Sequence, residues 1–286
     1  MNFDGFSEYA ALESGNAESI RRFATEENVG FNIVRRGLDV RTQEDSKRVN
    51  RRIGRYVTFD CGGEVYSSMR AAKRMESLLV ETIKSMLDLR GRGSALVIGL
   101  GNGQIACDSL GFKVFDKIEP RSAQIAKSAL QRCVFALSTG VFAKTGVETS
   151  RVVLALVREL KPSFVVLVDS LATGSMTRVG RSFQLSTAGL SPGKGVGESG
   201  EKIDKSLLGV PVLSIGVPTI LTLPTTIYGV TKEYLESQNM TIDEYAFRNL
   251  LAERKISDMI VAPKNVDILV ESAAVLISNA LNLAFA

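Results

Sequence analysis

Histidine is absent from this 286-residue chain. Without it there can be no Ser-His-Asp triad, no Cys-His pair and no metal site with a histidine ligand. If the protein is an enzyme, its proton transfers must therefore use carboxylates, lysines, hydroxyls or thiols.

Cysteine is also scarce. Cys61, Cys107 and Cys133 lie far apart and form no CxxC pair, so neither a disulfide framework nor a zinc site is indicated. This pattern is typical of a protein in a reducing compartment. Cys107 lies beside Asp108, but with no histidine to activate the thiol we expect it to pack rather than to act as a nucleophile.

Signals for export and for membrane insertion are lacking as well. The first ten residues, MNFDGFSEYA, have no basic start and no apolar core, so secretion is not expected. Residues 206–231 carry no charge, but three prolines and three glycines interrupt them too often for a membrane-spanning helix. We expect a cytoplasmic protein without a membrane partner.

Net charge is small, at +4 from 35 basic and 31 acidic residues. So mild an excess fits a soluble protein better than a dedicated nucleic-acid binder, and no direct contact with nucleic acid is expected. Apolar residues make up 45% of the chain, enough to bury a substantial core.

Short apolar runs alternate with segments of helical periodicity after about residue 55. We expect strands at 55–61 (as an edge strand), 95–98, 134–138, 164–168, 182–186 and 212–217, and helices at 68–89, 119–130, 146–160 (capped by Thr145) and 265–283. This alternation predicts a three-layer αβα sandwich of the phosphorylase/hydrolase-like kind, with a largely parallel or mixed central sheet.

The first 55 residues are charged, lack a strong apolar period and contain an expected helix at 18–27. We interpret residues 1–55 as an N-terminal extension or pro-segment and residues 56–286 as one α/β catalytic domain.

Two of the expected strands lead to aspartates. The run Ala95–Ile98 is followed by three closely spaced glycines and then by Asp108, and the run Phe164–Val168 is followed by Asp169. If the strands are neighbours, the carboxyl groups share one crevice, where one keeps its proton while the other stays charged. Such a pair can activate water on an amide. Alternatively, Asp108 caps a helix and Asp169 caps a turn.

Several polar residues are candidates for substrate binding or support. Asn102 and Ser170 lie close in sequence to the two aspartates, and Glu148 either orients a substrate or stabilises a helix N-terminus. Gly193, Lys194 and Gly195 belong to a glycine-rich loop, residues 191–199, that either binds a substrate backbone or forms a surface turn. Lys194 favours an acidic substrate.

The glycines also allow a second interpretation. VIGLGNG with Glu119 downstream resembles the nucleotide loop of Rossmann-type S-adenosylmethionine-dependent methyltransferases. The dinucleotide fingerprint fits only in part, because Gln104 or Ala106 stands at its third glycine, depending on the register.

Longer motifs resemble those of the germination proteases of spore-forming bacteria. In order along the chain they are GLGN, CDSLG, KTGVETS, VLVDSLATGS, STAGLSPGKGVG, GVPVLSIGVPT and the closing NVDILVESAAVLISNALNLAFA. The chain departs from that family's usual pattern at Ala106 and Cys107 in place of Thr-Pro, at Phe112 in place of proline, and at Gly174 in place of arginine.

The resemblance implies a fold similar to that of the hydrogenase maturation proteases. It also implies an endopeptidase that is made as a zymogen, forms homo-oligomers, and degrades small acid-soluble spore proteins in the spore core with two catalytic aspartates, matched here by Asp108 and Asp169. Hydrogenase maturation proteases use a metal held partly by histidine, so for this chain we expect aspartate chemistry with neither metal nor cofactor. A non-catalytic relative of the family is the remaining alternative.

Overall fold

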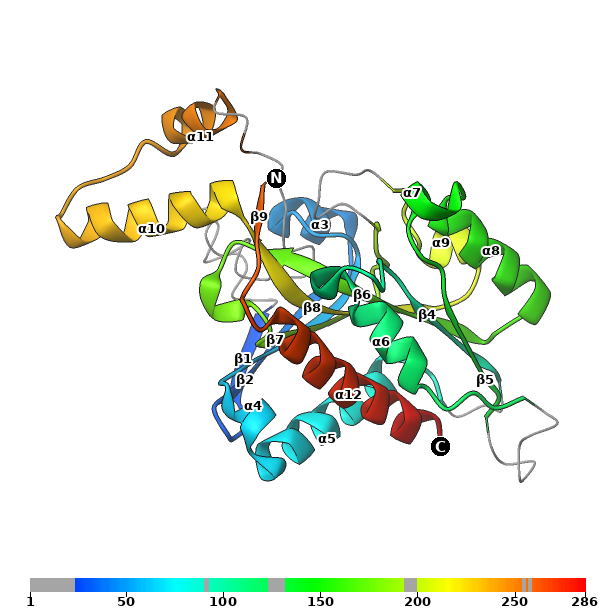
Figure 1. Cartoon of the computed structure of the whole chain (residues 1–286). Coiled ribbons are helices and arrows are strands. Elements are labelled where there is room, and N and C mark those ends of the chain that lie inside the picture. The colour runs from blue at the N-terminus through cyan, green and yellow to red at the C-terminus, as the bar shows by residue number, and fades with distance from the viewer. Residues whose placement is uncertain (1–23, 90–92, 123–131, 193–199, 254–255, 257–258) are drawn as a thin grey trace.

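A nine-stranded mixed sheet forms the centre of the molecule (Figure 1). The computed structural model describes residues 24–89, 93–122, 132–192, 200–253, 256 and 259–286. The strands are β1 (Ala24–Asn28), β2 (Ile33–Val40), β3 (Gly54–Cys61), β4 (Ala95–Gly99), β5 (Val134–Ser138), β6 (Phe164–Thr173), β7 (Ser182–Ser186), β8 (Val212–Thr222) and β9 (Ile260–Val261).

The sheet has a parallel half and an antiparallel half. Its order is β1-β2-β3-β7-β8-β6-β4-β5, and β9 pairs with the end of β8. Strands β8, β6, β4 and β5 run parallel, whereas β1, β2, β3, β7 and β8 form antiparallel pairs. The carboxyl ends of four parallel strands therefore meet at one edge, which is where open α/β sheets place their ligand sites.

Helices cover both faces of this sheet (Figure 1). On one face, α5 (Met69–Met86), α6 (Leu110–Lys117) and α12 (Val266–Phe285) pack against the sheet. On the other face lie α3 (Gln43–Val49), α8 (Thr149–Leu160) and α9 (Lys205–Leu208). Strand β4 shows why both faces are covered, because its side chains are apolar on both sides of the sheet. Ala95 and Val97 belong to the core on one face, and Leu96 and Ile98 belong to the core on the other. The predicted three-layer αβα sandwich is thus confirmed.

Most elements of the α/β part match the sequence prediction. Strands β4, β5 and β7 and helices α5 and α12 lie within a few residues of their expected bounds. Ser68 caps α5 by accepting a hydrogen bond from the Ala71 amide. Strands β6 and β8 are longer than expected and continue to Thr173 and Thr222.

Three predictions were wrong in part. Strand β3 is not at an edge, because β2 and β7 flank it. Thr145 does not cap α8; it ends the short helix α7 (Phe142–Thr145), after which Gly146 takes the left-handed conformation and α8 begins only at Thr149. Residues 119–122 are not helical, and the rest of the helix expected at 119–130 lies outside the described residues.

The N-terminal region contributes to the sheet. Residues 24–27 of the helix expected at 18–27 belong instead to strand β1, and residues 18–23 lie outside the described part of the chain. Strands β1 and β2 pair antiparallel, and Leu38 and Val40 of β2 are buried at alternate positions. The removal of part of the first 55 residues as a pro-segment stays a prediction.

The remaining helices are short or peripheral. The short α4 (Glu64–Ser67) precedes α5, and α10 (Leu223–Ser237) and α11 (Glu244–Glu253) extend away from the sheet (Figure 1). In the described residues, α12 alone is long and apolar enough to cross a membrane by length and composition, and about half of it is buried inside the protein. It packs against α5 and α6, which is also how the core helix of a globular protein behaves.

Candidate active site

The connection from β4 to α6 is folded tightly around Asp108. After β4 the chain turns at Gly101, whose φ is +90°, and reaches the 3₁₀ helix η1 (Ala106–Asp108) before α6 begins at Leu110. A Cβ atom on Gly101 would lie 2.3 Å from the carbonyl oxygen of Asp108 and 2.7 Å from its carboxylate. Only glycine leaves room for Asp108 here and adopts this backbone conformation without strain.

Backbone amides of this turn hold Asp108. The Asn102 N–H donates to Oδ2 of Asp108 at 2.8 Å and to its carbonyl oxygen at 3.0 Å. The Gln104 and Ile105 N–H groups donate to the side-chain and main-chain oxygens of Asn102. These three amides bond within the turn, so the glycine-rich loop does not offer them to a phosphate.

Asp169 lies within β6 rather than after it, which corrects the expected end of that strand. Asp169 is opposite Gly216 of β8 in the register, and its side chain is only 8% exposed. Its own neighbour supplies a donor, since the Ser170 N–H lies 2.9 Å from Oδ1.

The two aspartates interact electrostatically. Burial raises the pKa of Asp169 from 3.8 to about 8, with the negative charge of Asp108 as a further cause, and the hydrogen bond from Ser170 opposes the shift. Strands β4 and β6 are neighbours, and the Leu100 N–H donates to the Val168 carbonyl at 2.8 Å, directly before Asp169. At neutral pH the Asp169 carboxyl group is therefore protonated, so the site holds a proton donor close to a second carboxyl group.

Other predicted residues take varied positions. Asn102 and Ser170 both belong to this site, and Oγ of Ser170 accepts from the Leu110 N–H at the start of α6. Glu148 is exposed at the start of α8, and its side chain makes no capping hydrogen bond there. Gly193, Lys194 and Gly195 lie outside the described residues.

Cys107 is half-buried next to Asp108. Burial and the charge of Asp108 both raise the pKa of its thiol, which keeps the thiol protonated and weakens it as a nucleophile. This agrees with the packing role expected from the sequence. In the described part of the chain, no three His, Cys, Asp or Glu side chains gather into a group that could hold a metal ion.

Sequence reasoning missed two contacts that shape the site. Lys144 of α7 donates to the Gln104 side chain and so joins the loop after β5 to the loop after β4. Thr219 of β8 donates to the carbonyl oxygen of Cys107. Both contacts depend on which strands are neighbours, which the sequence does not reveal. The motif GVPT gave a partial signal, because it places the Thr219 hydroxyl just after an expected strand.

Comparison with known proteins identifies close relatives. A family model described as germination protease matches residues 7–251. Germination protease from Clostridium perfringens strain SM101 is 29% identical over 280 residues, covering 91% of this chain and 86% of that protein. The protein of the same name from Clostridium tetani is 31% identical over 270 residues, covering 86% and 83%.

One solved structure is also similar. It is the [NiFe] hydrogenase maturation protease HycI from Thermococcus kodakarensis, with 16% sequence identity and a TM-score of 0.36. The match covers 66% of this chain and 92% of that one.

Replacing Asp169 is expected to stabilise the protein at neutral pH. Because folding raises the pKa of Asp169 from 3.8 to about 8, the stability contributed by its protonated form is complete below pH 3.8 and is lost as the pH rises through about 8. At pH 7 an Asp169→Asn variant, which cannot ionise, should be more stable by up to about 4 kcal/mol.

Chemical denaturation from pH 4 to 8 tests this, and the difference between variant and wild type should shrink toward the acid end. Asp116→Asn, a change at an exposed aspartate of α6, is the matched control and should leave stability nearly unchanged. A variant less stable than wild type at pH 7 would contradict the buried, protonated state of Asp169.

Proposed function

This chain belongs to the germination protease family and is a peptidase, and from that premise we propose that it cleaves small acid-soluble spore proteins with Asp108 and Asp169 as its catalytic pair. The observation that supports this pair is the raised pKa of Asp169, which results from burial and from the charge of Asp108. A carboxyl group that keeps its proton close to a charged carboxylate supplies an acid and a base at the same pH.

In the proposed reaction, Asp108 is the base and Asp169 the acid. The Asp108 carboxylate takes a proton from a water molecule as the water oxygen attacks the carbonyl carbon of the scissile peptide bond. Asp169 gives its proton to the carbonyl oxygen, so a neutral tetrahedral diol forms.

Collapse of this intermediate restores both groups. Asp108 passes the proton that it took from water to the leaving nitrogen, and the C–N bond breaks. Asp169 recovers a proton from one hydroxyl of the diol as the new carboxyl group forms. The water has then been added across the peptide bond, and each aspartate has returned to its starting state.

Substrate, location and assembly follow from family membership as parts of the same proposal. The relatives are named germination proteases, and we extend from this to small acid-soluble spore proteins as substrate, to the spore core as location, and to a homo-oligomer made as a zymogen. The loop carrying Lys194 is the candidate for contacts to acidic substrate side chains.

Neutralising either aspartate should abolish cleavage. We expect Asp108→Asn and Asp169→Asn each to lower kcat by about 10²- to 10⁴-fold, because each removes one of the two proton transfers. Cleavage of a purified small acid-soluble spore protein, followed by mass spectrometry, measures this, with Asp116→Asn as the control that keeps activity.

Full activity in either variant would exclude the two-aspartate mechanism. A wild-type protein that cuts no spore protein under any condition would instead indicate the non-catalytic relative. If chemical denaturation shows that Asp169→Asn is at least as stable as wild type, its loss of activity cannot be ascribed to unfolding.

Activity should fall as the pH rises through about 8. The proposed acid, Asp169, has its pKa raised to about 8, so its protonated fraction declines there. The pH dependence of kcat/KM reports this ionisation in the free enzyme.

In Asp108→Asn the pKa of Asp169, followed by NMR of ¹³C-labelled aspartate, should fall because the repelling charge is gone. An unchanged pKa in that variant would show that the two groups do not interact.

Processing of the N-terminus should leave the sheet intact. The described sheet starts at Ala24, so a cut before this residue keeps β1 and β2 paired. We expect mass spectrometry of the protein after incubation in acid to show a shorter species with its new N-terminus within the first 55 residues. An unchanged mass would count against the zymogen proposal, and a new N-terminus after residue 24 would remove part of β1, or of β1 and β2, and would contradict the expectation that the sheet stays intact.

A further inference from the structure

Strand β8 has an extra residue beside the site. Leu171 of β6 pairs with Pro218 of β8, but the next residue, Ala172, pairs with Ile220. Thr219 is therefore the unpaired residue of a β-bulge. Bulges often lie next to active sites, where they redirect a side chain out of the regular alternation of the strand.

The redirected side chain contacts the turn that carries Asp108. Thr219 is 2% exposed, and its Oγ1 donates to the carbonyl oxygen of Cys107 at 2.6 Å. Cys107 immediately precedes Asp108 within η1. Three residues before the bulge, Gly216 of β8 is opposite Asp169 of β6. One strand is thus bonded to both segments that carry the aspartates.

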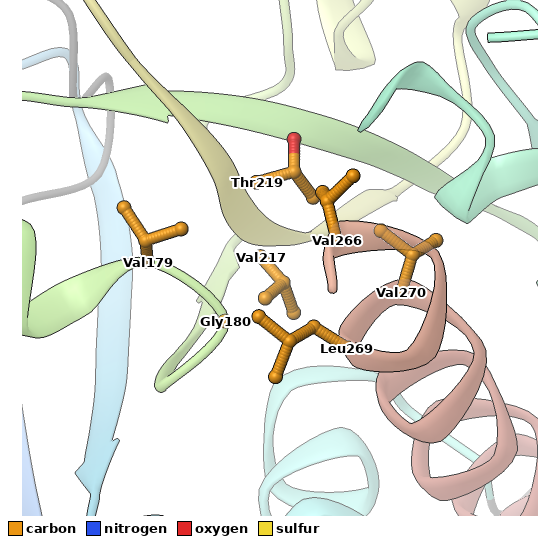
Figure 2. Close-up of a pocket in the computed structure, with 7 residues that line it drawn as sticks. All are labelled: Val179, Gly180, Val217, Thr219, Val266, Leu269 and Val270. Atoms are coloured by element: carbon orange, nitrogen blue, oxygen red, sulfur yellow. The ribbon is translucent and has the colours of Figure 1, made fainter. Parts of the chain in front are cut away.

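The surroundings of Thr219 leave its hydroxyl few other partners. Figure 2 shows an apolar hollow between β8, the loop before β7 and the first turns of α12, in which Thr219 is the one polar side chain in the lining. The other lining residues are Val179, Gly180, Val217, Val266, Leu269 and Val270. In this view the hydroxyl oxygen of Thr219 is turned away from Val217. A buried hydroxyl among apolar groups is costly unless it is hydrogen-bonded, which favours the bond to Cys107 strongly.

We propose that Thr219 is a positioning residue that fixes the place of Asp108 relative to Asp169. This inference rests on the proposed two-aspartate mechanism. Without the Thr219 hydroxyl, the carbonyl oxygen of Cys107 loses its hydrogen bond to β8. A displacement of about 1 Å at a reacting group can cost about 10²-fold in rate, so a single buried bond at this position matters to catalysis.

The charge of Asp108 acting on Asp169 offers a second readout. In the described part of the chain, Asp108 is the ionisable group that raises the pKa of Asp169, with Cys107 the next ionisable group along η1. On β8, the residue opposite Asp169 is Gly216. On β4, Gly99 is opposite Val168, the residue before Asp169 in β6. Neither neighbouring strand therefore places a charged side chain beside Asp169. A looser η1 should therefore let the pKa of Asp169 fall.

Thr219→Val tests the proposal because it keeps the shape of the side chain and removes the donor. We expect kcat to fall by about 10- to 100-fold with a smaller change in KM, and the upper limit of the pH profile to move to lower pH. Thr219→Ser keeps the hydroxyl and should restore both toward wild type. Ser214→Ala is the control on the same strand, since the buried Ser214 hydroxyl has no hydrogen-bond partner among the described residues.

The outcomes separate this inference from the proposed function. Thermal unfolding shows whether Thr219→Val is folded. If it is folded and keeps the wild-type kcat and pH profile while Asp108→Asn is inactive, the positioning role is wrong and the catalytic pair stands. If Asp108→Asn and Asp169→Asn are both fully active, the catalytic pair itself is wrong. If Thr219→Val fails to fold, the NMR pKa of Asp169 in Thr219→Ser and in wild type decides, and a clear difference despite the retained hydroxyl would overturn the proposal.

Discussion

The burial of one carboxyl group, Asp169, close to the charge of another, Asp108, is the constraint on which the candidate site depends. Asp169 is buried deeply enough to stay protonated at neutral pH, and the charge of Asp108 reinforces this state. Bringing such groups together costs stability, so the fold must hold them in place by other contacts. It does so by placing Asp169 within β6 and Asp108 in the tight turn after the neighbouring strand β4, and with backbone donors from Asn102 and Ser170.

Close backbone packing supplies much of that rigidity. A Cβ atom on Gly99 would lie 2.1 Å from the carbonyl oxygen of Gly111, and one on Gly111 would lie within 2.5 Å of both Leu100 and Val168 backbone atoms. The first turn of α6 therefore sits directly on the ends of β4 and β6, which leaves Asp108 little freedom to move. The glycines that resembled a nucleotide loop in the sequence serve to place a carboxylate.

Sequence patterns predicted the four parallel strands and also β3 and β7 of the antiparallel half, but they missed β1 and β2. Runs such as Ala95–Ile98 are apolar at every position, which marks a strand covered on both faces, and they led to Asp108 and Asp169. In β2 the charged Arg35, Arg36 and Asp39 obscured the buried alternation of Leu38 and Val40. The role of Thr219 could not be predicted, because a bulge arises from the pairing of two distant strands and leaves no local signal.

The outer strands also bear on how the sheet avoids unwanted partners. An edge strand presents unpaired backbone groups that can recruit a strand from another molecule and start aggregation. Here β1 has Glu26 and Glu27 exposed, and β2 behind it carries Arg36 in an ion pair with Asp60 of β3. Strands β1, β2 and β3, counted inward from this edge, therefore each carry charged side chains. The sheet would keep a charged border against intermolecular strand pairing even if the chain were shortened through β1.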